Sequence, residues 1–193
     1  MASHLQRRVL KPTMSVKKSV QNIRFSVIGK DRSLFNGPKV PAARDVCDLF
    51  EACQGALPNF NKTIVAGEKH RDAYLAKVKT SLENSDVIVV AYDESVQGLW
   101  MLKNTRRIIG MGRAVSDGAL VATLHDIMVH PEYQRQGIGR RIVKLLTTYL
   151  DTRMDVIDVG VVVVNDGGFE RFLERSGFGE DDEGSTAMLL RVE

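Results

Sequence analysis

The sequence predicts an α/β domain, or α+β by stricter naming, with a mixed six- to seven-stranded sheet and helices on both faces. The first observation is that β-branched runs are interspersed with segments whose apolar residues recur every three or four positions, in the order β-α-α-β-β-β-α-β-α-β. The second is the composition: 44% of the 193 residues are hydrophobic and 26% are charged, as in ordinary globular proteins. We therefore expect one folded domain.

The first half of the chain predicts one strand, two helices and a hairpin. Residues 23–28 alternate apolar and polar side chains, as a half-buried strand does. Helical spacing of apolar residues then predicts helices over 44–54 and around 74–82. Two β-branched runs at 87–92 and 108–115 predict an antiparallel pair of strands with a long connection.

The second half predicts a strand, a helix and a parallel strand, followed by a short closing unit. Residues 120–129 lack strict alternation, which is typical of a central strand covered on both faces. Apolar residues at intervals of three and four predict a helix over 138–150, and 159–164 predicts a strand parallel to 120–129. A short helix at 169–173 and a closing strand near 187–192 complete the order.

Basic residues are concentrated at the N-terminus. The formal net charge is +3, but residues 1–30 hold seven Lys and Arg and no acid, which leaves 20 basic against 24 acidic residues elsewhere. We expect a basic leader over 1–21 and the folded domain over 22–193. The Arg-, Lys- and Ser-rich composition predicts an organelle transit peptide, with a disordered basic tail and a nucleic-acid-binding arm as the alternatives.

Membrane and metal partners are not expected. No segment approaches the ~20 consecutive apolar residues that cross a bilayer. The two cysteines, Cys47 and Cys53, lie six residues apart in a predicted helix, without the spacing of a zinc site. We expect two reduced thiols in a soluble protein without a metal, and the sequence leaves monomer and homodimer open.

Residues 134–141, with the sequence QRQGIGRR, lie between a predicted strand and an amphipathic helix. The first N–H groups of a helix lack intrahelical partners and carry partial positive charge, which suits a phosphate. Gly137 and Gly139 would let an anion approach the backbone, although glycines also occur in ordinary turns. A dinucleotide fingerprint and a P-loop are excluded by the spacing. Three arginines would add charge: Arg135, Arg140 and Arg141.

Residues 127–139, with the sequence IMVHPEYQRQGIG, resemble the [Q/R]xxGx[G/A] motif and preceding strand of the GNAT superfamily of acetyl-CoA-dependent N-acetyltransferases. The resemblance extends from about Ile108 to Phe178 and includes a closing Gly-Phe. The runs GMGRA at 110–114, SDG at 116–118 and LHD at 124–126 are most similar to chloroplast acetyltransferases of plants and algae. The first 80 residues resemble the family only in the order of their elements.

The resemblance implies that acetyl-CoA lies along the strand that ends at Val129. Its pantetheine arm would pair with the backbone of Ile127 and Val129 as an added strand does, and its pyrophosphate would bind the loop that follows. Asn165 and Phe172 match family positions beside the cofactor; a turn and a core position are the alternative interpretations. The implied cofactor-binding residues are Ile127, Met128, Val129, Gln134, Arg135, Gln136, Gly137, Ile138, Gly139, Arg140, Asn165 and Phe172.

Transfer to an aliphatic amine requires a base, because the amine is protonated at neutral pH. Strict alternation would place His125 on the face of Ile127 and Val129 and turn Asp126 away. The ordinary pKa of histidine, about 6.5, suits a base, and His125 matches a His of the arylalkylamine N-acetyltransferases. Asp126 is the alternative base, and a core histidine is the alternative interpretation of His125. The amide of Met128 or Val129 would donate to the thioester carbonyl.

Leu173 departs from the family, which commonly has a Tyr there whose hydroxyl protonates the departing CoA thiolate. Because a thiol has a pKa near 8.5, water could protonate the thiolate instead.

The sequence thus predicts an N-acetyltransferase that acts by direct attack in a ternary complex, on a protein lysine, an N-terminal amine or an arylalkylamine. We expect it in a chloroplast or another organelle, and otherwise in the cytoplasm. Leu173 favours the alternative of a non-catalytic acyl-CoA sensor or interaction module. Nucleic-acid binding through the basic leader is a third hypothesis.

Overall fold

The structure, a computed structural model, describes residues 22–30, 39–53, 68–95, 106–162 and 168–179. Within these ranges five strands form one sheet in the order β1-β2-β3-β4-β5. Neighbours from β1 to β4 are antiparallel, and β4 and β5 are parallel. The strands are β1 (Ile23–Gly29), β2 (Val87–Asp93), β3 (Arg107–Ser116), β4 (Val121–Val129) and β5 (Asp158–Val161).

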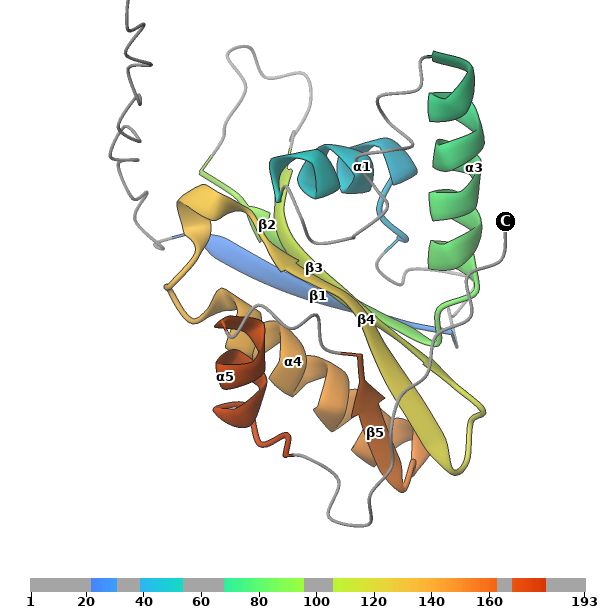
Figure 1. Ribbon diagram of the computed structural model, residues 1–193, viewed down its shortest axis with the longest axis vertical. Helices are drawn as coiled ribbons and strands as arrows, with labels where there is room; N and C mark the ends of the chain where they lie inside the picture. Colours follow the sequence, from blue (N-terminus) through green and yellow to red (C-terminus); the bar gives the residue numbers. More distant parts are fainter. Residues whose placement is uncertain (1–21, 31–38, 54–67, 96–105, 163–167, 180–193) are drawn as a thin grey trace, which may run out of the picture.

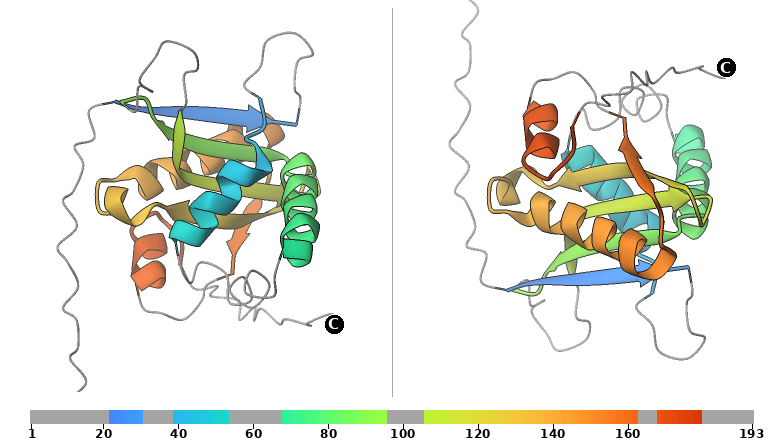
Figure 2. Two further views of the ribbon diagram at one scale, coloured as in Figure 1. Left: turned by 90° about the horizontal axis from the view of Figure 1, so that it is seen from above. Right: turned by 90° about the horizontal axis from the view of Figure 1, so that it is seen from below.

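Helices cover both faces of this sheet (Figure 1). One face carries α1 (Ala43–Ala52) and α3 (Glu68–Glu83), and the other carries α4 (Ile138–Tyr149) and α5 (Gly168–Glu174). Figure 2 shows α1 and α3 in front of the sheet when it is seen from above, and α4 running across the sheet when it is seen from below. The predicted mixed α/β fold is confirmed.

The predicted boundaries agree closely with the structure where both exist. The helix expected at 138–150 is α4, which continues as a π-helical turn, η2 (Leu150–Met154). The strand expected at 159–164 is shorter, because β5 ends at Val161. The expected leader at 1–21 and the closing strand near 187–192 lie outside the described residues, so the described sheet has five strands rather than six or seven.

The strand buried on both faces is β2 rather than residues 120–129. Every side chain from Val87 to Ala91 is 0% exposed, because β2 lies between β1 and β3 under both helix layers. In β4, by contrast, the side chains from His125 to Ile127 are only half-buried. The central part of β4 is therefore accessible, although β4 is an internal strand of the described sheet.

Two glycines of β3 let α4 pack closely on the sheet. A Cβ at Gly112 would lie 2.9 Å from the Ile142 Cγ2 and 3.0 Å from the Leu146 Cδ1. A Cβ at Gly110 would lie 3.1 Å from the Ile142 Cδ1. Since real Cβ contacts are almost never that short, the absence of side chains at these positions fixes how near α4 approaches β3.

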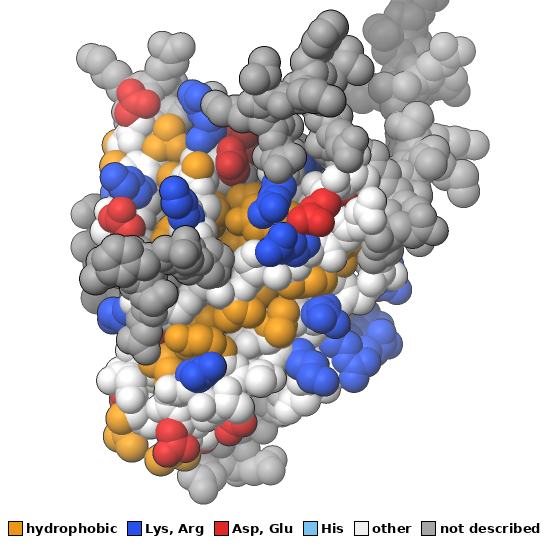
Figure 3. All heavy atoms as spheres, turned by 180° about the vertical axis from the view of Figure 1, so that it is seen from behind, with side chains coloured by type: hydrophobic (Ala, Val, Ile, Leu, Met, Phe, Trp, Pro, Cys, Tyr) orange, Lys and Arg blue, Asp and Glu red, His pale blue; other side chains and the backbone are white. Residues whose placement is uncertain are grey.

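β1 forms one edge of the described sheet, on the side seen in Figure 3, where a band of hydrophobic side chains runs between Lys and Arg side chains. Its half-buried Phe25 packs against the α4-side core. Arg141 of α4 lies over the Phe25 ring, 5.1 Å from its centroid, in a cation–π contact. Within the described part of the chain, no helix is both long and apolar enough to span a membrane.

Candidate functional site

β4 contains a bulge at Asp126. The β3–β4 register shifts by one residue between the pairs Arg113–His125 and Met111–Met128, so that β4 carries an extra residue there. Asp126 has a φ of 52°, in the left-handed region that Asp tolerates better than most residues. The bulge interrupts the alternation of side chains along the strand.

Because of the bulge, the side chains of β4 point to other faces of the sheet than the sequence predicted. Leu124 and Ile127 both pack in the core on the α4 side, although they are three residues apart. His125 lies directly opposite Arg113 of β3, and the Asp126 carboxylate also binds Arg113, so all three side chains share the other face. The prediction that His125 shares a face with Ile127 was therefore wrong, because strict alternation does not hold across a bulge.

Arg113 and Asp126 form an ion pair on the side of the sheet covered by α1 and α3. Arg113 Nε donates to Asp126 Oδ2 at 2.5 Å, and Arg113 Nη1 donates to the Ser85 hydroxyl at 3.5 Å. The two charged side chains are only 15% and 13% exposed. The sequence analysis missed Arg113 as a site residue; its signal is that it is the single charged residue within 108–115.

His125 is half-buried beside this ion pair. Burial lowers the pKa of the imidazole from its usual value, the Arg113 guanidinium lowers it further, and the Asp126 carboxylate partly offsets both effects. The imidazole is consequently neutral at pH 7 and can accept a proton. Its neighbour Asp126 has its carboxylate engaged by Arg113, which leaves His125 as the freer proton acceptor of the two.

The loop 134–137 joins β4 and a short 3-10 turn, η1 (Pro131–Tyr133), to α4. Arg135 has a φ of 64° and Gly137 a φ of 81°, so the loop contains two left-handed residues. The first N–H groups of α4 lack a carbonyl four residues earlier in the helix and are directed towards this loop. A negative charge bound there would also face the positive end of the helix dipole.

Side chains of the loop hold it against the end of β4. Gln134 Nε2 donates to the Val129 carbonyl oxygen at 2.9 Å. Gln136 Nε2 donates to the Glu132 carbonyl oxygen at 3.4 Å. Both glutamines were predicted to bind cofactor, and the structure gives their amide groups a role in shaping the loop.

A buried hydrogen bond anchors the residue that precedes the loop. The Tyr133 hydroxyl donates to the Asp93 carboxylate at the end of β2, and both residues are buried. Burial, together with the bond to Asp93, raises the pKa of Tyr133 to about 12. The other Asp93 oxygen accepts from the Ser95 backbone N–H at 2.8 Å. The anchor ties the start of the loop to the sheet.

The edge of β4 that faces β5 is only partly paired. The parallel pairs run from Val121–Asp158 to Leu124–Val161 and end there. Among the described residues, positions 125–129 of β4 have no partner strand on that side. Unpaired strand edges accept extended chains through their N–H and C=O groups.

Phe172 of α5 lies where this edge meets α4. A Cβ at Gly139 would lie 3.3 Å from the Phe172 ring and 3.6 Å from the Val129 Cγ2, so the three residues are neighbours. Phe172 also stacks on Phe169, with ring centroids 5.8 Å apart. The structure thus brings the end of β4, the start of α4 and α5 together.

The remaining predicted residues fall into three groups. Met128 and Ile138 are buried core side chains, so only their backbone groups are available to a ligand. Arg135, Arg140 and Arg141 are all exposed, and the guanidinium of Arg141 lies over the Phe25 ring of β1. The predicted position 165 lies outside the described residues.

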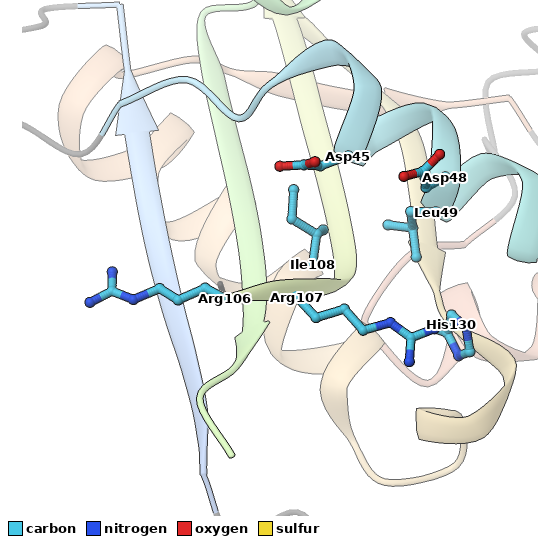
Figure 4. A pocket seen from close by; sticks show the side chains of 7 residues that line it. All are labelled: Asp45, Asp48, Leu49, Arg106, Arg107, Ile108 and His130. Carbon is cyan, nitrogen blue, oxygen red and sulfur yellow. Dashed lines mark hydrogen bonds between the residues drawn. The ribbon is translucent and has the colours of Figure 1, made fainter. Parts of the chain in front are cut away.

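A cavity of about 150 Å³ opens on the α1 side, beside the end of β4 (Figure 4). Arg107 extends towards His130 there, with Arg107 Nη2 2.8 Å from His130 Nε2, and also lies 3.8 Å from Glu132. None of the predicted site residues lines this cavity, although His130 directly follows Val129. Its lining consists of Asp45, Asp48, Leu49, Arg106, Arg107, Ile108 and His130.

Sequence comparisons identify relatives of this chain. Residues 65–178 match the family model described as "Acetyltransferase (GNAT) family". GCN5-related N-acetyltransferase 3, chloroplastic, from Arabidopsis thaliana is 43% identical over 85 residues, which are 44% of this chain and 34% of that protein. The chain spans about a third to a half of the length of the curated plant relatives that it matches.

Solved structures share the fold. A GNAT family acetyltransferase from Streptococcus pneumoniae superposes with a TM-score of 0.57 and 20% identity, over 88% of this chain and 98% of that one. An aminoglycoside N-acetyltransferase in complex with CoA gives a TM-score of 0.54 and 14% identity, over 89% and 95% of the two chains. Because the family model covers more than half of the sequence and includes β4, the loop and α4, this chain belongs to the acetyltransferase (GNAT) family.

Proposed function

We propose that this chain transfers the acetyl group of acetyl-CoA to a primary amine by direct attack in a ternary complex. The observation that carries the proposal is the continuity of two features: the β4 edge that has no partner strand among the described residues after Leu124 continues through η1 into the loop 134–137 at the start of α4. A ligand with an extended, amide-containing chain followed by a pyrophosphate would match the strand edge and then the loop.

The loop suits the pyrophosphate. The amides of Arg135 to Arg140 are the donors, since the first helical N–H groups have no partner within α4. Gly137 already adopts the left-handed conformation, and Gly139 has no Cβ between the backbone and Phe172. The exposed Arg135 and Arg140 add positive charge without a protein partner among the described residues.

The backbone of Ile127 and Val129 is the proposed partner of the pantetheine arm. Gln134 already donates to the Val129 carbonyl oxygen, but a carbonyl oxygen has two lone pairs and can accept a second hydrogen bond. Pairing along this edge brings the thioester end of the substrate to the bulge at Asp126, where the amide of Met128 or Val129 donates to the carbonyl.

His125 is the proposed base. It accepts the proton that the ammonium group of the acceptor loses, directly or through water, and the lowered pKa of His125 keeps the imidazole neutral for this step. The amine nitrogen then bonds to the carbonyl carbon and the carbon–sulfur bond breaks. The proton that the nitrogen still has to lose reaches the CoA thiolate through water, because Leu173, buried at 2% exposure, has no proton to give.

The acceptor class and the location are part of the proposal. A protein lysine, an N-terminal amine and an arylalkylamine all present a primary amine. Histone acetyltransferase TAP1 from Glycine max, 33% identical over 117 residues, supports a protein acceptor by its name. The chloroplastic names of two Arabidopsis relatives support a plastid location, to which the basic residues 1–21 would direct the chain.

Binding and transfer can be measured separately. Titration calorimetry with acetyl-CoA should show binding, and Arg140→Gln should weaken it several-fold, whereas Arg141→Gln, whose guanidinium lies over Phe25, should not. No binding up to millimolar acetyl-CoA would reject the proposal. Mass spectrometry of lysate peptides and an amine library, incubated with labelled acetyl-CoA, then identifies the acceptor. Binding without any transfer would favour the non-catalytic sensor that Leu173 suggests.

A further inference from the structure

We propose that Arg113 and Asp126 are a positioning pair that holds the β4 bulge and thereby fixes His125 on the α1 and α3 side of the sheet. The pair itself is a feature of the structure, while the catalytic consequence rests on the proposed role of His125. Neither residue is assigned contact with the reacting atoms.

The first argument is conformational. Asp126 is a residue other than glycine in the left-handed region, and such a residue persists only where its surroundings hold it. The ion pair to Arg113 holds it in place. Arg113 Nε lies 2.5 Å from Asp126 Oδ2, and the two side chains are only 15% and 13% exposed. A buried carboxylate without its partner would be strongly unfavourable, so Asp126 must point towards β3 on the α1 and α3 side.

The second argument is the cost of losing the bulge. If the same residues followed strict alternation without a bulge, Ile127 would turn to the face of His125 and Met128 would turn into the opposite core. Ile127 now packs on the α4 side, and Met128 is buried on the α1 side at 4% exposure. Both cores, and the backbone that leads into the loop, therefore depend on the bulge.

The third argument is electrostatic. Arg113 is both the cross-strand neighbour of His125 and the partner of Asp126. Tyr74 of α3 interacts with Asp126, and Cys47 of α1 interacts with Tyr74. Burial raises the pKa of Tyr74, and Cys47 and Asp126 raise it further, so the phenol is uncharged at neutral pH. The charges at His125 thus come from the pair, with opposite effects: Arg113 lowers the His125 pKa and Asp126 raises it.

Because Arg113 and Asp126 have opposite effects on the pKa of His125, an NMR titration of this imidazole tests the pair. The His125 signal is assigned by its disappearance in His125→Gln. Arg113→Gln should raise the pKa of His125 and Asp126→Asn should lower it, while both should reduce kcat about tenfold or more. Arg113→Lys should keep the pKa close to that of the wild type but still lose activity, because lysine lacks the guanidinium fork. Arg107→Gln, which removes an exposed arginine of the same strand, is the matched control.

A glycine rescue tests the conformational role. The double variant Arg113→Gln/Asp126→Gly lacks the pair but has a residue that favours positive φ, so it should retain the bulge and more kcat than Arg113→Gln/Asp126→Ala. Equal activity of the two double variants, or pKa shifts of the same sign in the two single variants, would overturn the proposal. If the wild type transferred no acetyl group, the titration would still report on the pair, which separates this inference from the proposed function.

Discussion

Leu124 and Ile127 pack into the same core, on the α4 side of β4, although they are three positions apart in one strand. Asp126, which lies between them in the left-handed conformation, forms the bulge. Its carboxylate is bound to Arg113. A strand that keeps its alternation would present both His125 and Ile127 to the same face. The bulge therefore places a titratable side chain on one face and keeps both neighbouring apolar residues in the opposite core.

We expect Gly112→Ala to destabilise the protein by about 1–3 kcal/mol, because its Cβ would meet Ile142 and Leu146 at 2.9 and 3.0 Å. Urea denaturation followed by circular dichroism measures the loss. Gly160→Ala is the control, since its Cβ would meet its nearest neighbour, the Ala122 carbonyl oxygen, at 3.9 Å. Equal stability of the Gly112 variant and the wild type would contradict the close packing of α4.

We expect Gly137→Ala to cost about 1–2 kcal/mol of stability and to weaken acetyl-CoA binding, because alanine is strained at a φ of 81°. Nothing lies within 4 Å of the added Cβ, so the effect comes from the backbone and not from a clash. Thermal unfolding and calorimetry measure the two quantities. Gly118→Ala, at the same φ in the β3–β4 turn, should cost similar stability and leave binding intact.

The rate of transfer should fall on the acid side of the pH profile, because only the unprotonated imidazole of His125 accepts a proton. Its pKa lies below the usual 6.5, so kcat/KM should reach its plateau by neutral pH. His125→Gln should remove this limb and most of the activity. An unchanged profile in His125→Gln would reject His125 as the base.

The same shift predicts how stability depends on pH. Because the folded pKa of His125 is lower than the unfolded one, the unfolded state binds the proton more tightly, and stability is lost as pH falls through about 6.5 towards the folded pKa. Chemical denaturation between pH 7.5 and 5 should show a smaller loss in His125→Gln than in the wild type. A steeper loss in the variant would contradict the sign of the shift.

We expect Tyr133→Phe to destabilise the protein by about 1–3 kcal/mol, because it removes a donor from the buried Asp93 carboxylate. Weaker acetyl-CoA binding should accompany the loss, since Tyr133 directly precedes the loop 134–137. Denaturation and calorimetry on the single variants, and on Tyr133→Phe/Asp93→Asn, give the coupling between the two residues. Additive losses in the double variant would show that the bond contributes nothing to stability.

The periodic parts of the chain were predictable because their signals are local. The apolar spacing of 138–150 specifies α4 to within one residue, and the β-branched run at 87–92 specifies β2. The loop 134–137 was predicted as an anion site because glycines before an amphipathic helix have a local physical meaning. The strand most buried on both faces was misassigned, since burial depends on which strands flank it in the sheet.

The sequence by itself determined the order of the elements, the place of the loop that we propose binds phosphate, and the family resemblance, because each follows from residue types at fixed short spacings. Only the tertiary structure decided which face His125 occupies, since the bulge at Asp126 depends on Arg113, thirteen residues earlier and on the neighbouring strand. The tertiary structure also showed that the guanidinium of Arg141 lies over the Phe25 ring, a contact between α4 and β1. Charge and alternation are properties of a local segment. The partner of a buried charge, by contrast, is fixed by the packing of segments that are distant in the sequence.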